Sequence, residues 1–229
     1  VGTGASAIIG SMQGRAFSLP TSHGWVRGKF VTIADISFAV FQRHAAGHRV
    51  PPHRVNYLAV AEGCRRLGLR GVLATAAVGS LRSEWSPGTL VACSDFVDFT
   101  FRRLTAHHDA THIDFSQPFD ARLTKCLSES GDVVAGGVYG GGDGPRYETP
   151  AEIRMLKTLG VDVVGMTASS EAIAVRENGI SYACLAIVTN LAAGISANPL
   201  SHEEVVAEMS LSGRRALDAL MAGSRRFLS

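Results

Sequence analysis

The sequence lacks the features that mark nucleic-acid-binding, membrane-spanning and disulfide-rich proteins. Its 22 lysines and arginines nearly balance its 20 aspartates and glutamates, and the net charge of +2 argues against a nucleic-acid surface. No apolar run approaches the roughly 20 residues that a membrane span needs, and no secretory h-region opens the sequence. The four cysteines contain no CxxC pair. We therefore expect an intracellular, cytoplasmic protein with reduced cysteines.

Motifs of several enzyme classes are also missing. There is no GxSxG elbow, which argues against a serine hydrolase of the α/β type. Neither a GxGxxG that opens a helix nor a GxxxxGK[ST] occurs, so the usual nucleotide-cofactor loops are absent. His107 and His108 are adjacent in the sequence, and no cysteine pair lies near them or near His112, which argues against a structural metal. We therefore expect no metal.

What the sequence does contain is a regular order of apolar segments. Its 229 residues, 46% hydrophobic and 18% charged, are enough for a substantial core, and we expect one domain over residues 1–229. Continuous apolar runs are typical of central strands covered on both faces. A hairpin is predicted over 29–44 with its turn near Asp35, further strands over 71–80, 89–97, 133–140, 161–167 and 182–190, and helices over 54–69, 119–129, 150–159, 168–178 and 202–222. This alternation predicts a three-layer α/β/α fold with a mixed, largely parallel central sheet.

Polar groups follow the predicted strands at the edge where ligands bind in open α/β sheets. Arginine binds phosphate or carboxylate through parallel N–H bonds, small residues leave backbone N–H groups open to an anion, and an amide both donates and accepts. The groups at these strand ends are Arg43 and His44, Ala77 among small neighbours, Met166 and Thr167, Asn190, and the glycine-rich turn before Tyr147 and Glu148. We expect them to converge on one ligand.

Simpler interpretations of some of these residues stay open. Arg43 is equally consistent with an exposed charge at a turn. Glu148 could cap the helix that follows it, because acidic residues favour a helix N-terminus. His202 follows Ser201, which resembles an N-cap, and is then a solvated first-turn histidine. Glu152 and Glu171 are interpreted as helix-surface charges.

Five ordered motifs carry a family resemblance. RHAAGHRVPPHRVNY, ATAAVGSLRSEWSPG, GPRYETPAEI, VVGMT and VTNLAAG resemble the trimeric purine nucleoside phosphorylases, whose superfamily includes the methylthioadenosine and methylthioinosine phosphorylases. The similarity spans about residues 7–222. It implies reversible phosphorolysis, in which inorganic phosphate attacks C1′ of a purine nucleoside without a metal or an organic cofactor. It also implies a homotrimer.

The resemblance assigns roles to individual residues. It implies a phosphate site made by Ser11, Arg43, His44, the backbone N–H of Ala77 and the hydroxyl of Thr167. Met166 would lie beneath the sugar, Tyr147 against the purine, and His112 in the pocket of a neighbouring subunit. Asn190, Glu148 and His202 would be the catalytic set. Two departures weaken the phosphate site: IIGSM stands around Ser11 where relatives have two glycines, and Ala76 stands where they have asparagine or threonine.

Three of these residues bear on the substrate. Glu148 can accept a hydrogen bond from N1–H of a 6-oxopurine and Asn190 can donate to its O6 or N7, which favours inosine and guanosine over adenosine. His202 matches the histidine that binds the 5′-hydroxyl. S-methyl-5′-thioinosine or 5′-methylthioadenosine phosphorolysis is the alternative. A water-using nucleosidase and a non-catalytic purine nucleoside-binding protein are weaker alternatives.

Overall fold

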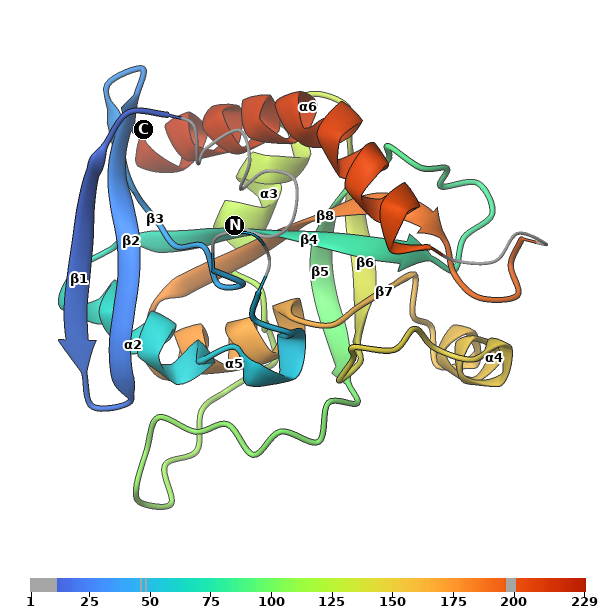
Figure 1. Cartoon of the computed structure of the whole chain (residues 1–229), viewed down its shortest axis with the longest axis horizontal. Helices are drawn as coiled ribbons and strands as arrows, with labels where there is room; N and C mark the ends of the chain where they lie inside the picture. The colour runs from blue at the N-terminus through green and yellow to red at the C-terminus, as the bar shows by residue number, and fades with distance from the viewer. Residues whose placement is uncertain (1–11, 46, 48, 197–200) are drawn as a thin grey trace.

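The structure is a computed structural model that describes residues 12–45, 47, 49–196 and 201–229. Two sheets and their helices make up this part of the chain (Figure 1). The strands are β1 (Arg15–Thr21), β2 (Gly24–Ile33), β3 (Ile36–Val40), β4 (Gly71–Ser80), β5 (Leu90–Asp98), β6 (Val133–Gly141), β7 (Val163–Gly165) and β8 (Ser181–Leu191). The helices are η1 (Pro52–Arg54), α2 (Tyr57–Arg66), α3 (Ala121–Ser128), α4 (Pro150–Thr158), α5 (Ala168–Glu177) and α6 (His202–Leu228).

The first sheet is antiparallel and contains the predicted hairpin. β2 pairs with β3 around a two-residue turn in which Ala34 and Asp35 have φ values of 46° and 70°. Positive φ at both central residues is the geometry that matches the twist of a hairpin, and aspartate tolerates it well. The predicted turn near Asp35 is therefore confirmed. β1 pairs with the other edge of β2 and was not predicted.

The second sheet contains the other five strands, in the order β4-β7-β6-β5-β8, and it closes on itself. Three of its pairs are parallel (β4 with β8, β5 with β6, β6 with β7), whereas β4–β7 and β5–β8 are antiparallel. A mixed, largely parallel sheet is thus confirmed. Its closure was not predicted, because it depends on pairs such as β4 with β8 and β5 with β8, whose strands are far apart in the sequence.

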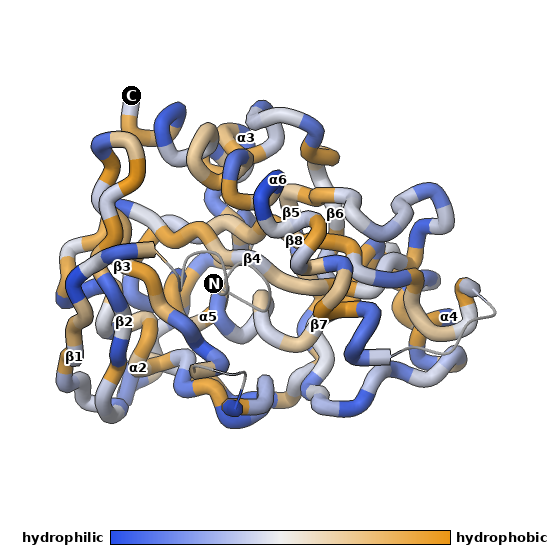
Figure 2. Tube along the Cα trace, turned by 45° about the horizontal axis from the view of Figure 1, so that its top comes forward, coloured by the Kyte–Doolittle hydropathy of each residue, from blue (hydrophilic) through white to orange (hydrophobic). Residues whose placement is uncertain are grey.

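Helices cover this sheet on two sides. α2 packs against α5 on one side and α3 packs against α6 on the other, as Figure 1 shows. Residues Tyr182–Thr189 of β8 are buried throughout, which explains why this strand is continuously apolar (Figure 2). The α/β class is confirmed. Among the described residues, none of the helices combines the length and hydrophobicity of a membrane-spanning segment.

Candidate functional site

A cavity of about 400 Å³ lies where the ends of β4, β7 and β8 meet the start of α6. This volume suits a small-molecule ligand. Nine of the eleven predicted site residues line it, so the loops beyond these strands do converge: Arg43, His44, Ala77, Tyr147, Glu148, Met166, Thr167, Asn190 and His202. Arg49, Pro51, Pro52 and Val205 line it as well and were not predicted.

The other two predicted residues are not part of this lining. Ser11 lies outside the described residues, so its place in a phosphate site stays a prediction. His112 is exposed on the long connection between β5 and α3, which extends from the body of the chain in Figure 1. Its contribution to the pocket of a neighbouring subunit is likewise a prediction.

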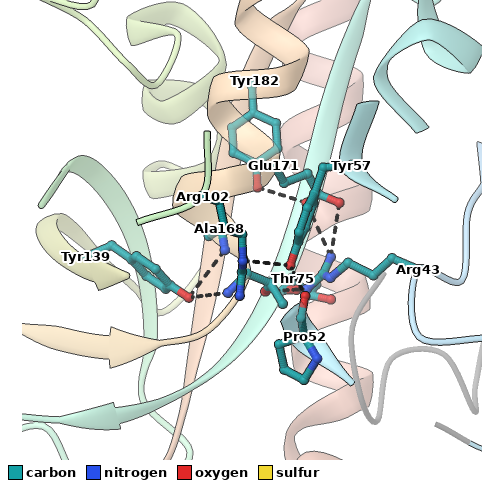
Figure 3. A network of polar contacts seen from close by, with 10 residues as sticks. Arg43, Pro52, Tyr57, Thr75, Arg102, Tyr139, Ala168, Glu171 and Tyr182 are labelled. Atoms are coloured by element: carbon teal, nitrogen blue, oxygen red, sulfur yellow. Dashed lines mark hydrogen bonds and ion pairs between the residues drawn. The ribbon is translucent and has the colours of Figure 1, made fainter. Parts of the chain in front are cut away.

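Arg43 is a buried residue, and the interpretation as an exposed turn charge is wrong. Its side chain is 2% exposed. Nη2 donates to the backbone oxygen of Thr75 at 2.6 Å and to Oγ1 of Thr167 at 3.1 Å. Nη1 lies 3.3 Å from Oε2 of Glu171 (Figure 3). These bonds fix the guanidinium at the cavity wall.

Glu171 was interpreted as a helix-surface charge, and that interpretation is wrong. The residue is only 5% exposed, and its carboxylate accepts from Arg43 and, at 2.9 Å, from the hydroxyl of Tyr182 (Figure 3). Helix α5 is buried along almost its whole length, so its first-turn acid has no access to solvent. The run ASSEAIAV, with a single charge among small and apolar residues, is the sequence signal of a buried helix.

The ion pair keeps Arg43 charged. Burial, the largest single effect, lowers the pKa of Arg43, but the Glu171 carboxylate and the nearby Tyr182, Tyr57 and Cys184 together raise it, so that the net shift is upward. The cation lies next to the N-terminus of α5, whose backbone carries positive potential. This side of the cavity is therefore electrostatically suited to an anion.

The backbone at the start of α5 is held by a buried phenol. The N–H groups of Thr167 and Ala168 donate to the hydroxyl of Tyr139 at 3.1 and 3.3 Å. Burial, the largest effect, raises the pKa of Tyr139, which therefore stays neutral. The hydroxyl of Thr167 makes no capping bond within α5 and accepts from Arg43 instead. Thr167 and Arg43 are thereby oriented together.

His44 is held by a backbone carbonyl. Its Nδ1 lies 2.8 Å from the oxygen of Val50, and because a carbonyl only accepts, Nδ1 carries the hydrogen in this contact. The residue is 8% exposed. The contact leaves Nε2 as the ring nitrogen that is not committed to Val50.

Glu148 and Asn190 also line the cavity. Burial raises the pKa of the Glu148 carboxyl. Thr149, not Glu148, caps α4, through a capping box with Glu152, so the helix-cap interpretation of Glu148 is wrong. Oδ1 of Asn190 accepts from Oγ1 of Thr189 at 2.9 Å and Nδ2 donates to the oxygen of Leu191 at 3.0 Å. The amide is thereby oriented, and Nδ2 retains a second hydrogen.

The glycines before Tyr147 allow the close approach of this loop. A Cβ on Gly142 would lie 2.8 Å from Oε1 of Glu148, and a Cβ on Gly144 would collide with the thioether of Met166. Gly144 also has a φ of 65°, a conformation that favours glycine. His202 is the first residue of α6, behind the N-cap Ser201 as predicted, yet it also lines the cavity.

Comparison with known proteins gives this arrangement a family. Residues 18–222 match the phosphorylase superfamily. The chain belongs to this superfamily. It is 45% identical over 189 residues to a probable 6-oxopurine nucleoside phosphorylase of Moorella thermoacetica, covering 78% of this chain and 73% of that one. It is 43% identical over 189 residues to a probable S-methyl-5′-thioinosine phosphorylase of Methanothermobacter thermautotrophicus, covering 82% and 68%.

Solved structures agree with the superfamily assignment. An adenosine/methylthioadenosine phosphorylase mutant of Schistosoma mansoni, in complex with methylthioadenosine, superposes with a TM-score of 0.88 at 26% identity. The match covers 98% of this chain and 88% of that one. The predicted family and fold are thus confirmed.

The roles of two residues next to the cavity were missed. Glu171 was named only as a helix-surface charge, and Arg102, whose side chain is 11% exposed, was not singled out from the sequence. Among the described residues, no group of three or more histidine, cysteine, aspartate or glutamate side chains is placed to hold a metal ion.

Proposed function

We propose that the chain catalyses the reversible phosphorolysis of 6-oxopurine nucleosides, with inosine and guanosine as substrates. The observation that carries the proposal is that one cavity is lined both by the buried Arg43–Thr167 pair and by Glu148 with Asn190. We assign the first group to the end that binds an inorganic oxyanion and the second to the end that binds a purine presenting both a donor and an acceptor. Membership of the phosphorylase superfamily supports the reaction type.

The phosphate end would hold the nucleophile. Arg43, Thr167 and the backbone N–H of Ala77 would donate to the phosphate oxygens, and Nε2 of His44 would accept the hydrogen of the phosphate hydroxyl. Ser11 completes this set in the proposal. The ordered guanidinium means that little reorganisation is needed when the anion binds, and this favours reaction over the same groups in water.

The purine end would stabilise the leaving base. In phosphorolysis the C1′–N9 bond breaks as the phosphate oxygen bonds to C1′, and the electron pair of the broken bond goes to the purine. Glu148 accepts from N1–H, Asn190 donates to O6 or N7 where negative charge develops, and Tyr147 packs against the ring. Stabilisation of charge that develops only in the transition state raises kcat.

The sugar would lie between the two ends. Met166 lines the cavity, so its side chain is available for apolar contact with the ribose. His202 at the first turn of α6 would bind the 5′-hydroxyl. The 43% identical relative named for methylthioinosine makes S-methyl-5′-thioinosine the second candidate substrate, because that nucleoside carries the same 6-oxopurine.

The testing experiment is a substrate panel. Inosine, guanosine, adenosine and the two 5′-methylthio nucleosides are each incubated with and without phosphate, and base release is followed. Phosphate-dependent release from inosine and guanosine is expected. Release that is indifferent to phosphate would indicate a nucleosidase, and binding without release would indicate a nucleoside-binding protein.

Exchange of His202 should separate the two candidate substrates. His202→Ala is expected to lower kcat/KM for inosine by about tenfold, the size of one lost hydrogen bond, and to leave S-methyl-5′-thioinosine within about twofold. The thioether of the latter offers no hydroxyl to the imidazole. Parallel kinetics on both nucleosides check this. Equal losses on the two would remove the 5′-hydroxyl role.

The pH profile should report Glu148. The proposal requires an ionised carboxylate, and burial raises its pKa above the ordinary 4.5, so kcat/KM for inosine is expected to fall on an acid limb that lies above pH 4.5. Glu148→Gln should abolish this limb and lower the activity.

The same variant bears on stability. Because a raised pKa means that the folded state binds the proton more tightly, the ionised carboxylate of Glu148 opposes folding as the pH rises. The glutamine variant should therefore be at least as stable as the wild type at pH 7; an unaltered acid limb in it would assign the titration to another group.

The assembly and cellular setting are further parts of the proposal. A homotrimer would bring His112 of one subunit to the cavity of the next. The four cysteines are free and buried in the structure, which supports a reducing, cytoplasmic location. The proposed reaction needs phosphate as its co-substrate and no cofactor, since no redox or carbanion step occurs.

A further inference from the structure

Arg102 connects several walls of the cavity without lining it. It follows β5, and its side chain is 11% exposed. Nη1 donates to the backbone oxygen of Met166 at 3.3 Å and to Oγ of Ser170 at 2.7 Å. Nη2 donates to the backbone oxygen of Asp143 at 2.9 Å and pairs with its carboxylate at 2.7 Å. One guanidinium therefore ties the glycine-rich loop before Tyr147, which we call the purine loop after its proposed role, to the end of β7 and the first turn of α5.

Arg102 also contacts the segment at Pro52, through the hydroxyl of Tyr57. Nη1 of Arg102 also donates to the hydroxyl of Tyr57 at 3.3 Å, and its guanidinium carbon lies 5.4 Å from the centre of that ring (Figure 3). The Tyr57 hydroxyl in turn donates to the backbone oxygen of Pro52 at 2.9 Å. Pro52 lines the cavity. The contacts of Arg102 thus extend to the segment that follows Arg43 and His44.

The backbone before Arg102 is strained in a way that directs this side chain inward. Phe101 has a φ of 52° although it is not glycine, and its side chain is 87% exposed. A bulky residue in this region of φ is uncommon and unfavourable unless the surroundings require it. The conformation turns an aromatic ring out to solvent while the following guanidinium is enclosed. We therefore connect the positive φ of Phe101 with the hydrogen bonds that the enclosed side chain of Arg102 makes.

We propose that Arg102 is a positioning residue for the nucleoside half of the site. It sets the distance between the purine loop and Met166 under the sugar, whereas the Arg43–Glu171 pair sets the phosphate half. A planar guanidinium with several donors is suited to this task, and a lysine ammonium cannot reproduce its geometry. The inference rests on the proposed function for the identity of the ligand.

The experiment measures the KM for inosine and the KM for phosphate separately in each variant. For Arg102→Lys, KM for inosine is expected to rise about tenfold, as for the loss of one or two hydrogen bonds, while KM for phosphate stays within about twofold. Asp143→Asn should raise KM for inosine in the same direction by less, because the backbone bond to Asp143 remains. Asp143 is half exposed, so this variant tests the idea even if Arg102→Lys does not fold.

Arg215→Lys is the matched control. Arg215 also joins two segments, through the backbone oxygen of Gly88 and the carboxylate of Asp132, but away from the cavity. The Arg215→Lys variant should change neither the KM for inosine nor the KM for phosphate. Equal rises of both KM values in the Arg102 and Asp143 variants, or wild-type kinetics with only a lower Tm, would overturn the positioning role.

Calorimetric titration of inosine into each variant separates this inference from the proposed function. Absence of phosphorolysis in the wild type would defeat the proposed function alone. Weaker inosine binding by the Arg102 and Asp143 variants would still support the positioning role, and unchanged binding would contradict it.

Discussion

Glu171→Ala is expected to lower the free energy of unfolding by about 3–5 kcal/mol, because it leaves the buried guanidinium of Arg43 without its counter-charge. The two side chains are 2% and 7% exposed, so water cannot replace the lost carboxylate. The Tyr182 hydroxyl, 2.9 Å from Oε2, loses its acceptor at the same time. Urea unfolding followed by far-UV circular dichroism measures the change.

Glu152→Ala is the matched control for this change. Glu152 is also a first-turn glutamate paired with an arginine, but its partner Arg146 is 68% exposed. Exposed ion pairs contribute little, so the control should lose much less stability. If both variants lost a similar free energy of unfolding, the buried Arg43–Glu171 pair would contribute no more to stability than an exposed ion pair, and our assignment would be wrong.

Arg43→Met is expected to lower kcat/KM for phosphorolysis by about 10²- to 10³-fold, the usual effect of removing a preorganised donor to a reacting anion. The single change also leaves Glu171 unpaired, which would confuse activity with folding. The double variant Arg43→Met, Glu171→Gln removes both charges together. Neutral replacement of a buried ion pair is often tolerated, and the glutamine can still accept from Tyr182.

The double variant should therefore be more stable than Arg43→Met yet remain as inactive. Initial rates over a range of phosphate concentrations give the activity and the KM for phosphate, and urea unfolding gives the stability. A wild-type KM for phosphate in the folded double variant would show that Arg43 does not bind the nucleophile, and the phosphate end of the cavity would need reassignment.

Much of the candidate site could be predicted because it depends on local features of the chain. Thr167 follows β7 and Asn190 lies near the end of β8, and the ends of strands in one sheet meet at one edge. Arg43 follows β3 of the first sheet, so its place at the same cavity depends on how the two sheets pack. The turn at Asp35 and the N-cap Ser201 were predictable for a similar reason, since each depends on a few adjacent residues. No long-range information is needed for features of this kind.

Glu171 and Arg102 show where local information ends. In the sequence, Glu171 and Glu152 are both acids in the first turn of a helix; they differ because α5 is enclosed by the sheet and α2, whereas α4 leaves Glu152 partly exposed. Arg102 and Arg103 are adjacent in a polar connection. Only the left-handed conformation of Phe101 and the acceptors on other elements single out Arg102.

The amino-acid sequence by itself determined most of the segments that become strands and helices, β1 excepted, and the polar groups near their ends, because hydrophobic periodicity and turn chemistry act over a few residues. The tertiary structure alone decided that the sheet closes, that Arg43 pairs with Glu171 128 residues away, and that Arg102 joins the glycine-rich loop at Asp143 to Met166. Ion pairs and burial depend on distances through space, and those distances exist only once the chain has folded.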